Sequence, residues 1–284
     1  MSALQTSRDF RVRRMVRHDL NHSFTWSVQE GWNIGLHDHA VFFATDPQGF
    51  FLGERDGEPV GSISGVAYGD TFGFIGIYIV KPELRGHGYG IQLFRAAMDY
   101  LGARNVGLDG VIAQQENYKR SGFRLAYRNI RFGVAGGGEM PSGLTPLSAV
   151  PFEKLEAYDR RHFFAPRPTF LQGWIRQRGA TALGVIQDGN LVGYGLVRPA
   201  VHGYLIGPLF AEDPATADLL FRALRAQPAG QSVFLDVPEV NPEALALAQR
   251  YGMQPVFETA RMYTGPAPDL PLSEIYGVTT FELG

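Results

Sequence analysis

The sequence predicts an α/β (α+β) protein of two similar halves. Strands and helices alternate along the chain, a glycine-rich stretch divides it near the middle, and the order of elements partly repeats beyond that stretch. Its 284 residues suffice for two domains, and 45% hydrophobic with 19% charged residues is typical of a globular protein with a sizeable core. We expect a first domain at 1–134, a linker at 135–143 and a second domain at 144–284.

In the first half, the residue pattern predicts a sheet interrupted by helices. The apolar run from Phe72 to Val80 is typical of a strand covered on both faces. Apolar residues then recur at helical spacing from Gly90, and Gly102 closes this helix. The expected strands are 10–16, 50–54, 58–68, 72–80, 105–112 and 122–132, and the expected helices are 19–30, 90–101 and 113–121.

The second half follows a similar order. Asp213 before Pro214 predicts a helix start, because aspartate caps helices and proline suits their first position. The expected strands are 180–187, 191–198, 203–206, 232–237 and 255–263, and the expected helices are 152–161, 170–178, 215–226 and 242–251.

Composition argues against several classes of function. A net charge of -2 gives no support to nucleic acid or an anionic membrane as partner. The absence of cysteine rules out disulfides, thiolate metal sites and cysteine nucleophiles. The N-terminus lacks the apolar core of a signal peptide, and the longest apolar run is about half a membrane span, so we expect a cytoplasmic protein. His37 and His39 have no third ligand beside them, and we expect no metal.

The loop between the apolar strand and its helix is the first candidate site. Three glycines among its six residues let the backbone approach a ligand closely. A helix start with unpaired amides binds anions, phosphates above all. The alternative is a tight turn that serves packing only. The residues concerned are Arg85, Gly86, His87, Gly88, Tyr89 and Gly90.

This loop resembles the R-x-x-G-x-G signature of the GCN5-related N-acetyltransferases (GNATs), and the pair Gly122-Phe123 lies where that family has a Gly-Phe pair. The resemblance covers about residues 8–133. It implies GNAT-like domains, each a mixed, mostly antiparallel sheet flanked by helices. It also implies that the loop binds the pyrophosphate of acetyl-CoA, the co-substrate, while Ile79 and Val80 pair with its pantetheine arm.

Tyr118 is the catalytic candidate that the resemblance implies. It lies four residues before the glycine of the Gly-Phe pair, as a tyrosine often does in the family, and would protonate the leaving CoA thiolate. The alternative is a ring that packs on the sheet with its hydroxyl at the surface. The family often has an asparagine where this chain has Val111, so Gln114, Gln115 or Asn117 could take over the contact to pantetheine.

The second half resembles a degenerate copy of the first. Arg131 and Arg261 follow corresponding glycines by nine residues, and Asp109 and Asp236 both follow a leucine in corresponding strands. The position of the catalytic tyrosine is occupied by Ala248.

The loop at 207–214 also departs from the phosphate-binding pattern. It lacks the glycine run and places Glu212 and Asp213 at the helix start, where carboxylates satisfy the amides and repel phosphate. We expect one CoA site per chain, in the first half. The second half would shape or cover the substrate pocket, including through contacts of a homodimer.

The acceptor site is less defined. An amine arrives protonated, so a carboxylate or ordered water is needed to remove its proton. Asp109 on the fifth strand is one candidate, although it could instead cap the following helix or turn. Glu30 and Trp32 lie where GNATs commonly build acceptor pockets, although Trp32 could be plain core.

We therefore expect an acetyl-CoA-dependent N-acetyltransferase that acts on a primary amine by direct attack in a ternary complex. A non-catalytic acyl-CoA-binding sensor or scaffold, or an enzyme using a longer acyl-CoA, are the alternatives. The acceptor would be a small-molecule or peptide amine. A polyamine, amino acid, aminoglycoside or protein N-terminus is each compatible with the sequence.

Overall fold

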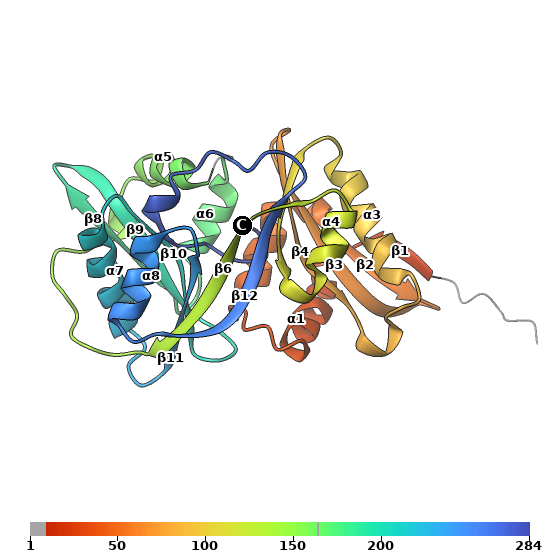
Figure 1. Cartoon of the computed structure of the whole chain (residues 1–284), viewed down its shortest axis with the longest axis horizontal. Coiled ribbons are helices and arrows are strands. Elements are labelled where there is room, and N and C mark those ends of the chain that lie inside the picture. The colour runs from red at the N-terminus through yellow and green to blue at the C-terminus, as the bar shows by residue number, and fades with distance from the viewer. Residues whose placement is uncertain (1–9, 164) are drawn as a thin grey trace, which may run out of the picture.

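The computed structural model describes residues 10–163 and 165–284. These residues form one mixed sheet of 13 strands, which runs through both halves and carries helices on its faces (Figure 1). The first half contributes β1 (Phe10–Arg14), α1 (Leu20–Gln29), α2 (Asp38–Thr45), β2 (Phe50–Arg55), β3 (Glu58–Tyr68), β4 (Phe72–Val80), α3 (Tyr89–Leu101), β5 (Asn105–Val111), α4 (Gln115–Arg120) and β6 (Arg124–Ala135).

The second half repeats this order of strands and helices. Its elements are β7 (Thr145–Pro146), α5 (Phe152–His162), α6 (Pro168–Trp174), β8 (Thr181–Gln187), β9 (Asn190–Pro199), β10 (Tyr204–Ala211), α7 (Pro214–Ala226), β11 (Ser232–Pro238), α8 (Pro242–Arg250), β12 (Gln254–Tyr263) and β13 (Ile275–Gly277). Among the described strands, β4 with β5 and β10 with β11 are parallel neighbours, and the other neighbours are antiparallel. The mixed, mostly antiparallel sheet is confirmed.

The two halves exchange their last strands. The order through the centre of the sheet is β5-β12-β6-β11, so β12 of the second half lies against β5 of the first, and β6 of the first half lies against β11 of the second. Figure 1 shows β6 and β12 side by side between the halves. The boundaries at 134 and 144 stay a prediction, and residues 136–144 contain no helix or strand, but the sheet is continuous across the two halves.

The helices bury apolar stripes on both faces of the sheet. In α3, Leu93, Phe94, Ala97 and Leu101 are buried in the same cluster as Ile63 of β3, and Gly102 ends the helix at a φ of 62°. A second buried cluster contains residues of α1 and α2 from the first half together with residues of α6 from the second half. The halves therefore share a core as well as a sheet.

The helix α2 is absent from the sequence-based expectation. Its N-cap, His37, makes no side-chain capping bond, so no local start signal is present. Phe42, fully buried, stacks on Trp174 of α6 with ring centroids 6.0 Å apart. Packing across the two halves, rather than local sequence, supports this helix.

Candidate active site

The glycine loop leaves the start of α3 open. Gly86 and Gly88 have φ of 80° and 79°, values that favour glycine, and Gly88 is the N-cap of α3 without a side-chain capping bond. At Gly90 a Cβ would lie 2.7 Å from the hydroxyl of Tyr78, so a larger residue would require the Tyr78 side chain to move. The loop presents uncapped amides at a helix N-terminus, an arrangement that suits a phosphate.

The strands β4 and β5 part in front of this loop. Their parallel pairing covers Phe72–Ile75 with Asn105–Leu108 and then stops. Just beyond, Ile77 adopts a φ of 49° where the register of β4 against β3 shifts, as in a β-bulge. The separation of the two strands opens the sheet beside the glycine loop.

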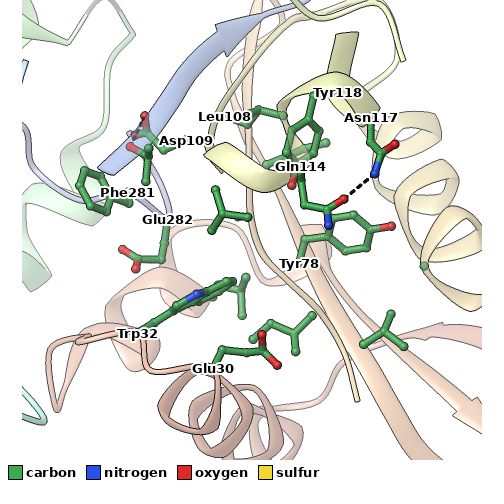
Figure 2. Close-up of a pocket in the computed structure, with 18 of the residues that line it drawn as sticks. Glu30, Trp32, Tyr78, Leu108, Asp109, Gln114, Asn117, Tyr118, Phe281 and Glu282 are labelled. Atoms are coloured by element: carbon green, nitrogen blue, oxygen red, sulfur yellow. Dashed lines mark hydrogen bonds between the residues drawn. The ribbon is translucent and has the colours of Figure 1, made fainter. Parts of the chain in front are cut away.

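A cavity of about 790 Å³ occupies this opening and is lined by residues of both halves. Figure 2 shows it bounded by α4 and Tyr78 on one side and by Trp32, Phe281 and Glu282 on another. Of the residues expected at the CoA site, those that line the cavity are Ile79, Val80, Arg85, Gly86, Tyr89 and Gly90. His87 and Gly88 are outside the lining; His87 stacks on Tyr89 with ring centroids 5.8 Å apart.

Tyr118 lines the cavity from α4 (Figure 2). Its ring packs closely over Gly110 of β5 and lies near Phe123 and Phe94. Burial raises the pKa of the Tyr118 phenol well above its ordinary value, and the nearby Tyr78 adds to this shift. The phenol therefore keeps its proton at neutral pH.

Gln114 and Asn117, two of the three amide residues that the sequence suggested for pantetheine, line the cavity. Asn117 donates a hydrogen bond to the Oε1 of Gln114 at 2.5 Å (Figure 2). Gln115, the third candidate, is outside the lining. Val111 lines the cavity at the position where the family often has asparagine.

Glu30 lines the cavity, but its carboxylate forms an ion pair with Arg85 of the glycine loop. The guanidinium of Arg85 forms an ion pair with the Oε1 of Glu30, and its Nε donates to the carbonyl of Val80 at 2.9 Å. Glu30 therefore positions Arg85 in this structure, and its contact with an acceptor stays a prediction.

Asp109 also lines the cavity, with both carboxylate oxygens engaged. Arg261 of the exchanged strand β12 donates to them at 2.9 and 2.5 Å, and Asn129 donates at 2.8 Å. Burial raises the pKa of Asp109, and Arg261 opposes that shift. Because Arg261 and Asn129 already donate to the carboxylate oxygens, the geometry favours a structural role for Asp109.

Trp32 is half-buried and lines the cavity as well as packing against the core. Two further lining residues, Phe281 and Glu282, belong to the C-terminal segment and were missed from the sequence. No local motif marks them, because their place depends on how the second half packs on the first.

The histidine pair shows no metal geometry. The described part of the chain contains no group of three or more His, Cys, Asp or Glu residues placed to hold a metal ion. Asp38, between the two histidines, accepts from Arg198 at 2.9 Å. Among the described helices, none is long and apolar enough to cross a membrane.

Family models match both halves of the chain. Residues 13–123 match the acetyltransferase (GNAT) family, and residues 155–277 match an acetyltransferase (GNAT) domain. Holothin acyltransferase from Pseudoalteromonas sp. (strain SANK 73390) is 34% identical over 262 residues, which cover 91% of this chain and 89% of that protein. The family match over residues 155–277 confirms that the C-terminal half is a further GNAT-like domain.

Solved structures share the fold over the whole chain. A protein from Pyrococcus horikoshii, proposed to be an acetyltransferase, superposes with a TM-score of 0.84 at 22% identity, covering 100% of this chain and 99% of its own. A tandem GNAT protein from the clavulanic acid biosynthesis pathway gives a TM-score of 0.63 at 15% identity, covering 92% of this chain and 100% of its own. At these identities the likeness concerns the fold alone.

Proposed function

This chain belongs to the GNAT family of acyltransferases, and from that premise we propose that it transfers an acetyl group from acetyl-CoA to a primary amine. The observation that carries the proposal is the uncapped, glycine-built start of α3 beside a cavity that also contains Tyr118. The amides of the loop would hold the pyrophosphate, and the opened edge of β4 would pair with the pantetheine arm. The cavity would then hold the thioester together with the amine.

The reaction proceeds by direct attack. The neutral amine attacks the thioester carbonyl, an N–C bond forms, and the C–S bond breaks. The CoA thiolate takes the proton of the Tyr118 phenol, and the nitrogen, on becoming an amide, returns a proton to the phenolate. No acyl-enzyme is needed, since the chain has no cysteine and the amine is itself the nucleophile.

Binding of acetyl-CoA tests the first step. At 100 times its Kd a ligand stabilises the fold by about 2.7 kcal/mol, so acetyl-CoA should raise the Tm by roughly 5 °C or more. Gly88→Val should abolish the increase, because valine strains a backbone with a φ of 79°. Gly189→Val is the matched control, since Gly189 has a φ of 77° and open space in a hairpin of the second half. No shift with any acyl-CoA would sink the proposal.

Turnover tests the second step and separates the alternatives. Release of CoA from acetyl-CoA with a panel of amines is expected of an enzyme, whereas an acyl-CoA sensor binds without release. Holothin belongs in that panel, because the 34% identical relative is named as its acyltransferase. A panel of acyl-CoA donors of increasing length decides whether acetyl is the preferred group.

A further inference from the structure

The C-terminal segment of the second half enters the cavity of the first. Tyr68 of β3 donates to the carbonyl of Leu283 at 3.0 Å. The Thr280 hydroxyl accepts from the amides of Glu282 and Leu283 at 3.1 and 2.9 Å. Gly76 of β4 leaves no room for a Cβ against the carbonyl of Glu282. These contacts anchor the backbone on both sides of Glu282, and Figure 1 shows the C-terminus at the middle of the molecule.

The Glu282 side chain lies in the pocket between Phe281 and Trp32 (Figure 2). Three carboxylates line this cavity, and two of them, Glu30 and Asp109, are paired with arginines. Within the described chain, no other residue donates a hydrogen bond or forms an ion pair with the Glu282 carboxylate. Among the described residues that line the cavity, Glu282 is therefore the one carboxylate that no other side chain pairs, and only its own backbone amide favours its ionised form by a hydrogen bond.

The charges that face Glu282 come from three elements. Asp38 of α2 disfavours its ionised form, while Arg131 of β6 and Arg198 of β9 favour it. Both arginines are already paired, Arg131 with Asp236 at 2.6 Å and Arg198 with Asp38 at 2.9 Å. Burial is the largest influence, and together these raise the pKa of Glu282 to about 7.

Part of the cavity wall is apolar. Phe234, Val256 and Phe257 line the cavity from the second half, and the rings of Phe257 and Phe281 have centroids 6.2 Å apart. Val256 and Phe257 remain 54% and 38% exposed, so their side chains leave apolar surface open beside the cavity. The Glu282 carboxylate thus shares the cavity with apolar surface that suits rings and hydrocarbon.

Resting on the function proposed above, we propose that the acceptor is a single amine on an apolar, ring-sized body, and that Glu282 binds this amine and takes its proton. One unpaired carboxylate matches one ammonium group, whereas a polyamine or an aminoglycoside would bring several charges into an apolar wall. An amino acid would bring a second carboxylate beside Glu282. The second half thereby supplies both the acceptor surface and the base.

The proton balance is complete with these groups. The ammonium gives one proton to the Glu282 carboxylate, which releases it to solvent after turnover. The freed amine attacks the thioester, and its second proton passes to the Tyr118 phenolate after the thiolate has taken the phenol proton. The products are the amide, CoA with its thiol, and one proton in solution.

The test compares amines and variants in the CoA-release assay with acetyl-CoA. The probes are phenethylamine, tryptamine, phenylalanine, spermidine and kanamycin. We expect kcat/KM for phenethylamine to exceed those for phenylalanine and spermidine at least about tenfold, because phenylalanine adds a like charge and spermidine adds unmatched ones. Glu282→Gln should lower kcat/KM about 100-fold and remove the rise of the rate through pH 7, and Glu282→Asp should keep that rise.

Glu153→Gln is the matched control, because Glu153 is exposed on α5 and outside the cavity, and it should behave as wild type. All variants should keep the Tm increase with acetyl-CoA. Preference for spermidine, or an unchanged rate and pH profile in Glu282→Gln, would overturn this inference alone. A Tm increase with acetyl-CoA but no turnover with any amine would overturn both this inference and the proposed transfer reaction.

Discussion

The two halves of the molecule differ most where their parallel strands part. In the first half β4 and β5 separate beyond Ile75 and Leu108, and the space is the cavity. In the second half β10 and β11 separate beyond Ile206 and Leu235, and β13 fills the space by pairing with β10. Just after β13, the backbone amide of Val278 donates to the backbone carbonyl of Asp236 at 2.9 Å, so the chain is also held against β11.

The helices that follow the two openings differ in how their N-termini are capped. The start of α3 is uncapped, whereas the Asp213 side chain accepts from the amides of Ala215 and Thr216 at the start of α7, at 2.8 and 2.9 Å. The capping expected from the sequence is confirmed. One GNAT opening is therefore closed by the chain itself, and the segment that closes it continues into the other opening.

The largest effect is expected from the ion pairs that join the exchanged strands. Asp109 pairs with Arg261, and Asp236 pairs with Arg131, so each pair links one half to the other. Arg261→Ala or Arg131→Ala should each cost about 3–5 kcal/mol in urea unfolding, because a buried carboxylate loses its partner.

The double variant Arg261→Ala with Asp109→Ala should recover part of the lost unfolding free energy, because it also removes the buried carboxylate that would have no partner. Similar costs in the two halves would support a symmetric exchange of strands. A loss of less than about 1 kcal/mol in the free energy of unfolding for either arginine variant would contradict a stabilising buried ion pair at that position.

The catalytic contrast between the halves rests on one tyrosine. Tyr118→Phe should lower kcat about 100-fold, equivalent to about 2.7 kcal/mol of transition-state stabilisation, because the thiolate loses its proton donor. The Tm and its increase with acetyl-CoA should not change. Tyr204→Phe, on β10 of the second half and outside the cavity, should leave kcat unaltered. Equal rates for Tyr118→Phe and wild type across pH would remove Tyr118 from the mechanism.

A smaller effect is expected at the capped helix. Asp213→Ala should cost about 1 kcal/mol of stability, because the amides of Ala215 and Thr216 lose their acceptor. It should not create a second CoA site, since β13 still fills the opening. The check is the Tm of Asp213→Ala combined with Gly88→Val, with and without acetyl-CoA. If acetyl-CoA raised the Tm of that double variant, the second half would bind acetyl-CoA, and the predicted difference between the halves would be wrong.

The last effect concerns the carboxylate that the second half places in the cavity. The pKa of Glu282 is raised from its ordinary 4.5 to about 7, so the folded state binds a proton that the unfolded state has lost between these values. By linkage, wild-type stability falls as pH rises through this range. Glu282→Gln cannot ionise, so its Tm should exceed that of wild type at pH 8 and match it near pH 4. A lower Tm at pH 8 would contradict an unpaired carboxylate.

Much of the fold was predictable because its signals are local. The apolar run of β4, the stripe of α3 and the cap of α7 each depend on a few neighbouring residues, and their positions in the structure lie close to those expected. The helix α2 and the strand β13 were missed, because they have weak start signals and depend on contacts with distant segments.

For the candidate site, the sequence by itself determined the glycine loop, the position of Tyr118 in the cavity wall and the loss of the glycine pattern from the second half. Only the tertiary structure decided which carboxylate stays unpaired. Arg85 pairs with Glu30 across 55 residues, Arg261 with Asp109 across 152, and Glu282 arrives from the last turn of the chain. Backbone conformation follows from adjacent residues, whereas the protonation of a carboxylate depends on burial and on charges brought near it by the whole fold.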